Sequence, residues 1–163
     1  MQLNDLVAYL NSTMGTQLEV VDGVVSMGVD DMEISLMEIM ENSSVVLHAK
    51  IADRPAEANL EKLSEAMLAA NYMFEGTGGA TISYSSDEKA YYLSRYENIA
   101  ILSGESFTQI LERFVNTLEM WRKLVIDFRA APVEESSPAG SSLAGPSLAG
   151  DDFSHPADAF MRV

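Results

Sequence analysis

The apolar residues of this chain recur with two different periods, which divide it into helical and extended segments. Residues 3–14 place leucine and valine at helical spacing, and Gly15 follows as a stop signal. Three short segments then alternate apolar with smaller or polar side chains, and turn-forming pairs such as Asp30-Asp31 separate them. These segments cover residues 25–29, 32–37 and 45–51. Short alternating segments joined by tight turns predict an antiparallel meander with one buried face.

The second half of the pattern begins with a helix and ends with a longer one. A helix is expected from Pro55 to about Tyr72, where leucine and methionine recur at helical spacing among acidic residues. A second hairpin is expected at residues 80–84 and 91–95. A last helix is expected at residues 106–129, where a serine followed three residues later by a glutamine gives a capping-box pattern. The order α-β-β-β-α-β-β-α predicts an α+β fold with helices packed on a twisted antiparallel sheet.

The composition changes after residue 130 and indicates the domain boundaries. Residues 131–150 are mostly serine, alanine, glycine and proline, with too little apolar surface to offset the entropy of ordering them. We therefore expect one folded domain at 1–130, a flexible linker at 131–150 and an acidic tail at 151–163. The tail also holds two phenylalanines and a methionine, so a short docking peptide is the alternative interpretation.

Charge narrows the classes of partner. The chain has 10 Lys and Arg against 25 Asp and Glu, a formal net charge of −15. Such a surface repels nucleic-acid phosphates and anionic membranes, so neither is an expected partner. No apolar run is long enough to span a membrane, and the first residues lack the pattern of a signal peptide. We therefore expect a cytoplasmic protein.

The residue types that carry most enzyme chemistry are scarce or poorly placed. Cysteine is absent, and the two histidines, His48 and His155, are too far apart in sequence for a helix-borne zinc site. His48 is expected on the solvated side of a strand. The glycine-rich segment 76–79 follows a helix and precedes a strand, the reverse of a phosphate-binding loop, so its glycines are expected to end the helix. Because the paired carboxylates lie in turns or in the tail, no enzyme activity, cofactor or metal is expected.

Methionine is the unusual feature of the composition. There are ten, and several crowd the first three strands. Each one fills the core or belongs to a surface that accepts varied apolar partners. In the strand at 32–39, Met37 and Ile39 alternate with Ile34 and Leu36, which places apolar side chains on both faces. Something is therefore expected to cover the second face, either a helix, a second copy of the chain or a foreign peptide.

Two segments of the chain resemble a known family. The first is the helix at 60–71, which leads into Gly76-Thr77-Gly78-Gly79. The second is Phe114-Val115-Asn116, which is followed by Trp121-Arg122 in the same helix. Together with the element order, small size and acidity, they resemble the Tir-chaperone (CesT) family, the class I chaperones of bacterial type III secretion. The resemblance extends over about residues 3–128, and it does not require the tail.

The resemblance implies a function that the pattern of residues does not show. Such chaperones are cytoplasmic homodimers that hydrolyse no nucleotide and bind the N-terminal region of a secreted effector. By analogy, one set of apolar side chains is a candidate for the effector groove. These are Leu3, Leu6, Val7, Met32, Ile34 and Met37. A second set is a candidate for the dimer contact. These are Leu60, Leu63 and Met67. The alternative is a domain of the same shape that binds a cytoplasmic regulator or another protein, with no role in secretion.

Overall fold

A computed structural model describes the backbone of residues 1–39, 43–55 and 60–130, and the side chains of these residues up to Phe128. The described residues belong to one compact unit, Met1–Val133. The linker expected at 131–150 and the tail expected at 151–163 lie outside the described residues, as do the residues between Pro55 and Leu60.

The described elements confirm the predicted fold class and order, with one short 3-10 turn added after the second helix. They are α1 (Leu3–Met14), β1 (Val24–Val29), β2 (Met32–Ile39), β3 (Ser44–Asp53), α2 (Leu60–Asn71), η2 (Tyr72–Phe74), β4 (Thr81–Ser85), β5 (Ala90–Asn98) and α3 (Gly104–Ala130).

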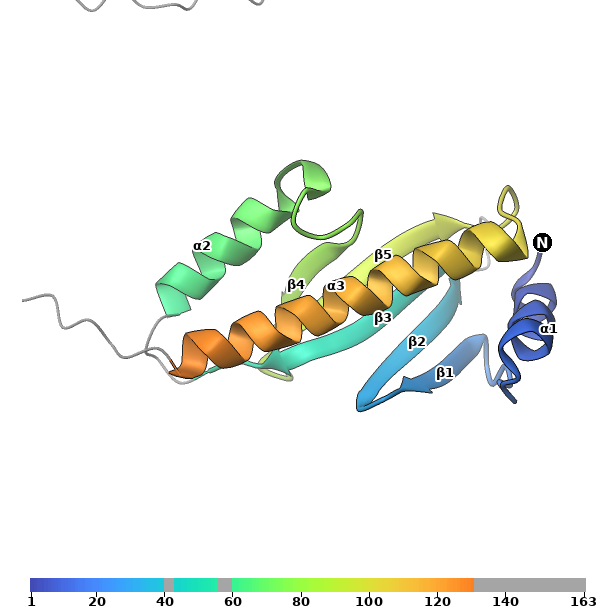
Figure 1. The fold of residues 1–163 in the computed structure, drawn as a ribbon, viewed down its shortest axis with the longest axis horizontal. Helices are drawn as coiled ribbons and strands as arrows, with labels where there is room; N and C mark the ends of the chain where they lie inside the picture. Colours follow the sequence, from blue (N-terminus) through green and yellow to red (C-terminus); the bar gives the residue numbers. More distant parts are fainter. Residues whose placement is uncertain (40–42, 56–59, 131–163) are drawn as a thin grey trace, which may run out of the picture. The chain divides into compact units, whose positions relative to one another are not determined.

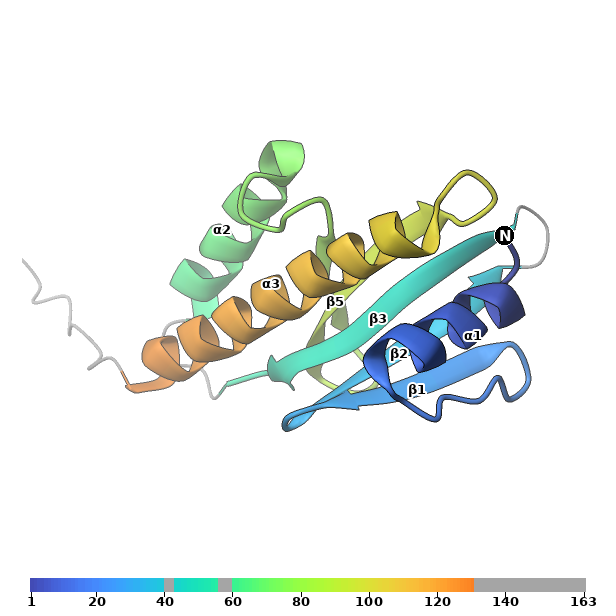
Figure 2. The same ribbon diagram turned by 45° about the vertical axis from the view of Figure 1, so that its right-hand side comes forward.

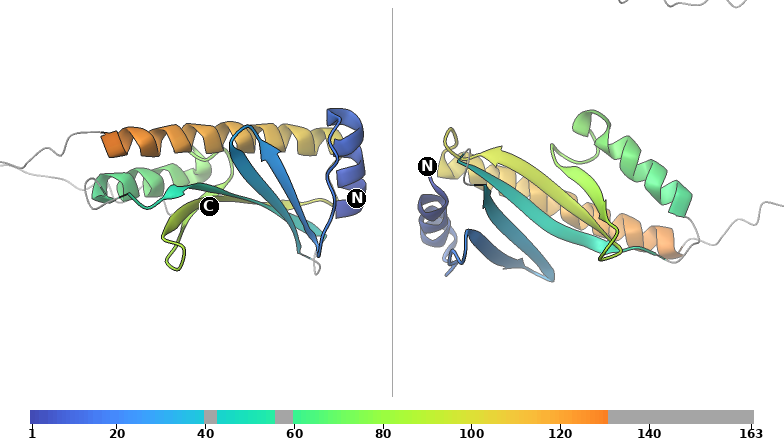
Figure 3. Two further views of the ribbon diagram at one scale, coloured as in Figure 1. Left: turned by 90° about the horizontal axis from the view of Figure 1, so that it is seen from below. Right: turned by 180° about the vertical axis from the view of Figure 1, so that it is seen from behind.

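The five strands form one antiparallel sheet in the order β1-β2-β3-β5-β4, so β1 and β4 are its edges. The long helix α3 crosses one face of this sheet over β3 (Figure 1). Helix α1 lies beside β1 and β2, near the N-terminal end of α3 (Figure 2). Helix α2 lies next to β4. The turn between β1 and β2 meets α3, where Arg122 bonds to the carboxylate of Asp31 (Figure 3, left).

The core lies between the sheet and α3. Alternate residues of the strands point inward, including Val25, Leu36 and Leu47, and each is fully buried. Helix α3 supplies the opposite layer through apolar side chains at helical spacing. These are Phe107, Leu111, Phe114, Leu118, Trp121 and Val125.

The opposite face of the sheet also holds apolar side chains, as the pattern of β2 predicts. Met37 pairs with Val24 of β1 and with Val46 of β3, and all three are half-buried. Tyr96 of β5 continues this row and is 55% exposed. Among the described elements, no helix lies over this face (Figure 3, right). The row is therefore a partly exposed apolar strip on an uncovered sheet.

The glycine-rich segment after α2 has the structural role that its position predicts. Gly78 and Gly79 have φ angles of 59° and 92°, which side chains with a Cβ rarely adopt. The indole Nε1 of Trp121 donates a hydrogen bond of 2.9 Å to the carbonyl oxygen of Gly76, which fixes the segment to α3. Gly76 itself lies so close to Ala70 that a Cβ would stand 2.6 Å from that side chain.

The predicted N-cap of the last helix is wrong by three residues. Helix α3 begins at Gly104, and the hydroxyl oxygen of Ser103 accepts a hydrogen bond of 3.1 Å from the backbone N–H of Ser106. Ser103 is therefore the capping residue, and Ser106 lies inside the first turn. Apolar periodicity begins only at Phe107, so the pattern placed the start one turn too late. Gly104 packs directly against the ring of Tyr9, where a Cβ would overlap the ring.

Candidate functional site

Most of the side chains proposed for the effector groove pack inside this chain. Leu3, Leu6 and Val7 of α1 are at most 6% exposed, because they form the face of α1 that packs into the core. Met32 and Ile34 of β2 are 6% and 0% exposed on the inner face of the sheet. In this structure these five residues line no open surface. Met37 differs, because it lies half-buried on the uncovered face of the sheet.

The side chains proposed for the dimer contact show the same division. Leu63 and Met67 are 0% and 4% exposed, so they attach α2 to its own core, and Leu60 is half-buried. The exposed apolar side chains of this region are their neighbours Leu68 and Tyr72, at 71% and 74%. Helical spacing identified α2 as amphipathic but could not tell its buried side from its exposed side.

An apolar hollow lies between α1, β1 and the N-terminal half of α3. We call it the α1–α3 hollow, and its volume is about 290 Å³. The side chains that line it come from the end of α1, the inner side of β1 and about two and a half turns of α3. They are Met14, Met27, Val29, Thr108, Leu111, Glu112, Val115 and Asn116. Near the hollow, Arg122 of α3 donates a hydrogen bond of 2.7 Å to the carboxylate of Asp31 in the turn after β1.

One side of the α1–α3 hollow is polar. Thr108, Glu112 and Asn116 follow one another at intervals of four residues, so they form a single line along α3. The hydroxyl of Thr108 donates to the carbonyl oxygen of Gly104 at 3.0 Å. Glu112 and Asn116 make no side-chain hydrogen bond or ion pair with any residue that the structure describes.

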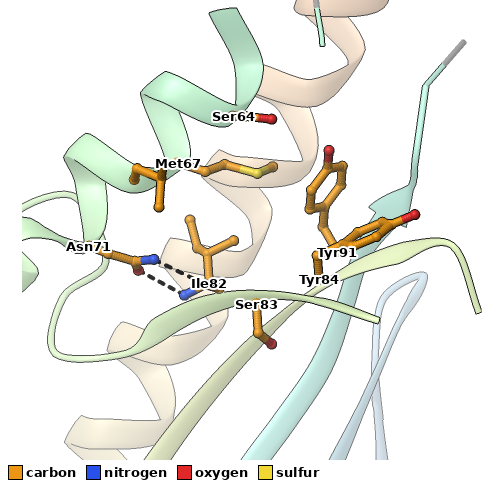
Figure 4. A pocket seen from close by; sticks show the side chains of 8 residues that line it. Ser64, Met67, Asn71, Ile82, Ser83, Tyr84 and Tyr91 are labelled. Atoms are coloured by element: carbon orange, nitrogen blue, oxygen red, sulfur yellow. Dashed lines mark hydrogen bonds between the residues drawn. The ribbon is translucent and has the colours of Figure 1, made fainter. Parts of the chain in front are cut away.

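A second apolar surface surrounds the end of α2. A pocket of about 220 Å³ lies between α2 and β4, with Met67, Ile82 and Tyr91 among its lining residues (Figure 4). Leu68 and Tyr84 also line this pocket and are exposed, and the large apolar side chains that directly follow α2 are exposed as well. The exposed set is Leu68, Tyr72, Met73, Phe74 and Tyr84. We call this set the α2–β4 surface.

The backbone holds the α2–β4 surface in a strained form. Met73 and Phe74 have φ angles of 51° and 59°, although neither is glycine. The amide of Asn71 fixes the segment, because its oxygen accepts a bond of 2.8 Å from the N–H of Ile82 and its nitrogen donates one of 3.0 Å to the carbonyl of the same residue (Figure 4). Such backbone angles persist only where the surrounding structure fixes them.

The expectation for His48 is wrong in one respect. Its ring is half-buried, stacks on Tyr92 with 4.7 Å between the ring centroids, and bonds through Nδ1 to the hydroxyl of Ser94 at 2.9 Å. Burial lowers the pKa of His48, and the charge of Glu88 offsets part of this decrease. The alternation correctly placed the ring on the outer face, but β5 supplies neighbours that the pattern of β3 alone does not show.

Within residues 1–39, 43–55 and 60–130, no three histidine or acidic side chains lie together in a way that could bind a metal ion. None of the described helices combines the length and the apolar character needed to cross a bilayer.

Comparisons with solved structures show that other proteins share this fold. The HopA1-SchA chaperone-effector complex contains a chain similar to this one at 17% identity and a TM-score of 0.58, covering 78% of this chain and 93% of that one. The ExoU-SpcU complex from the type III secretion system of Pseudomonas aeruginosa matches at 12% identity and 0.57, covering 74% and 94%. YbjN of E. coli, described as a candidate transcription regulator, matches at 14% and 0.59, covering 78% and 93%.

The sequence itself decides the family. The model of the Tir chaperone protein (CesT) family matches residues 5–122, which is most of the described part of the chain. A search of the curated proteins gives no significant match. The chain therefore belongs to the Tir chaperone protein (CesT) family. Members of this family are type III secretion chaperones and are not enzymes.

Proposed function

We propose that this chain is a homodimeric cytoplasmic chaperone that binds the N-terminal segment of a type III secreted effector in a non-globular state and keeps it competent for export. Family membership supports the class of function. The observation that carries the proposal is the α1–α3 hollow, an apolar hollow that the side chains of the described residues leave unfilled. An unfolded segment has the exposed apolar side chains that such a hollow accepts.

The fold provides a simple way to hold an extended chain. β1 is an edge strand beside the hollow, so its outer backbone groups can pair with an added strand whose side chains enter the hollow. The segment loses conformational entropy when it is ordered, and a preformed hollow reduces the additional cost. The net charge of −15 keeps a protein with exposed apolar surfaces soluble.

The α2–β4 surface supports the dimer in this proposal. Leu60, which is half-buried at the start of α2, remains a proposed contact residue. Leu63 and Met67 contribute indirectly, because they pack α2 against the core of its own subunit. Leu68, Tyr72 and their neighbours provide the contact itself. Met37, the one member of the proposed effector set that remains accessible, belongs to the strip on the uncovered sheet face. That strip is a second place where a wrapped effector segment can pack.

The test is co-expression with the protein encoded by the neighbouring gene, followed by purification of the chaperone. The expected result is that the partner co-purifies through its N-terminal region and that this region is protease-sensitive. Val115→Arg places a long charged side chain in the hollow and should reduce the bound partner at least about tenfold, because it occupies the space that an apolar side chain of the partner would fill. Met120→Arg is the matched control, since Met120 is on the same helix, outside the hollow and 43% exposed.

One observation favours a second function. YbjN, described as a candidate transcription regulator, shares the fold of this chain. The alternative is therefore a domain of this shape that binds a cytoplasmic regulator or another protein, with no role in secretion. Capture of a folded partner domain, unaffected by Val115→Arg, would support this alternative and contradict export chaperoning.

A further inference from the structure

The apolar part of the α1–α3 hollow discriminates poorly between side chains. Met14 and Met27 line it with unbranched, flexible side chains that adapt to partners of different shape. Val29, Leu111 and Val115 add aliphatic surface without a polar group. Leucine, isoleucine, methionine and phenylalanine therefore all fit such a lining. Selectivity for one segment over another must come from the polar side of the hollow.

Glu112 is the only charged residue that lines this hollow. Its polar neighbours along α3, Thr108 and Asn116, are neutral, and the hydroxyl of Thr108 is already bonded to Gly104. No described residue pairs with the Glu112 carboxylate. A segment seated on the apolar lining thus faces one uncompensated negative charge on the α3 side.

The electrostatic consequence has a definite sign. Glu112 is exposed in the free chain, and a segment seated on the hollow displaces part of the water around its carboxylate, which strengthens the interaction of that carboxylate with a charge on the segment. The net charge of −15 adds a long-range field of the same sign. An acidic side chain in the bound segment is repelled by both, and a basic one is attracted by both.

We infer that the α1–α3 hollow selects a segment in which a lysine or arginine lies next to the apolar side chain that enters the hollow, and that the carboxylate of Glu112 binds this basic side chain. The inference rests on the proposed function, since it assumes that the hollow binds a polypeptide segment. It adds the chemistry of that segment and identifies the residue responsible for selecting it. Asn116, one turn further along α3, lies beside the same segment as a neutral hydrogen-bonding group.

The experiment is selection of random dodecapeptides, displayed on phage, against the immobilised full-length chain and three variants. Glu112→Lys reverses the charge in the hollow, and Glu112→Gln removes it with little change of shape. Asp127→Lys makes the same charge reversal on the same helix, about four turns away and on an exposed side chain outside the hollow. Circular dichroism melting verifies that each variant is folded before selection.

The wild-type chain and Asp127→Lys should both enrich peptides with a basic residue at a fixed distance from an apolar one. Glu112→Lys should enrich acidic residues at that position instead. For a synthetic peptide taken from the wild-type selection, Glu112→Gln should weaken binding about two- to fivefold, the range of a single partly exposed ion pair. The effect should shrink as sodium chloride is raised.

The outcomes separate the inference from the proposed function. If Val115→Arg abolishes peptide binding but the wild-type peptides show no preference for basic residues, the inference is wrong and the hollow remains a peptide site. The same conclusion follows if Glu112→Lys leaves the preference unchanged. If no enriched peptide is sensitive to Val115→Arg, the hollow binds no peptide, and both the inference and this part of the proposed function are wrong.

Discussion

His48 shows how a residue on an uncovered sheet face can still be electrostatically sensitive. Its ring lies flat on Tyr92, and its Nδ1 bonds to Ser94, so both neighbours on β5 remove water from it. This burial lowers the pKa of His48 because the charged ring loses hydration. The folded protein therefore binds a proton at this site less readily than the unfolded chain does.

The pKa of His48 predicts a pH dependence of stability. Because the folded-state pKa lies below the ordinary value of 6.5, stability from this site is complete above pH 6.5 and decreases as the pH falls through and below that value. His48→Gln should remove this component, so its urea unfolding free energy should decrease less than that of wild type between pH 7 and pH 5.5. Glu88→Gln should steepen the decrease, since the charge of Glu88 raises the pKa. Identical pH profiles for wild type and His48→Gln would contradict the prediction.

Single residues also show why the site was harder to predict than the fold. Leu6 and Leu68 both belong to amphipathic helices, yet their exposures are 0% and 71%. Periodicity reports that a helix has an apolar side, but the choice of buried and accessible positions depends on which other element packs there. Periodicity therefore predicts α1, α2 and their order. It does not predict which side chains stay accessible: Leu3, Leu6 and Val7, which the resemblance suggests for the effector groove, are buried in this structure.

At the scale of elements, the ends of α3 and β1 determine the site. The hollow lies where α3 meets both of its neighbours, since Arg122 bonds to Asp31 in the turn after β1 and Gly104 packs against Tyr9 of α1. Neither contact has a local pattern, since each joins residues far apart in sequence. The sequence analysis includes Val115 only as part of a segment that resembles the family, and it does not identify Glu112. The signal that could have identified Glu112 is a charged residue among the apolar residues of α3.

The cap of α3 gives a prediction at this scale. Ser103→Ala removes the oxygen that accepts from the N–H of Ser106, so it should lower the unfolding free energy by about 1 kcal/mol, the usual cost of losing an N-cap. Ser106→Ala is the matched control and should cost clearly less, because its hydroxyl bonds only to that of Ser103. Urea unfolding followed by circular dichroism measures both. A larger effect for Ser106→Ala would restore the capping box predicted from the sequence.

At the scale of the whole molecule, charge and apolar surface act in opposite directions. A net charge of −15 keeps chains apart, whereas the α2–β4 surface exposes Leu68, Tyr72 and Phe74 together. Such a surface is stable in solution when a defined partner covers it. Charge repulsion then limits association to contacts that bury enough apolar area to overcome it, which favours a closed dimer over open-ended assembly.

This balance predicts that Leu68→Asp separates the dimer without unfolding its subunits. Leu68 is 71% exposed in the single chain, so the change should leave the unfolding free energy of the subunit within about 0.5 kcal/mol. It places a carboxylate in an apolar contact and should raise the dimer dissociation constant at least about 30-fold, the effect of losing a hot spot. Light scattering should give twice 17.8 kDa for wild type and for the control Ile126→Asp, which is 59% exposed on α3, and 17.8 kDa for Leu68→Asp. Equal masses for the two variants would show that the α2–β4 surface is not the contact between subunits.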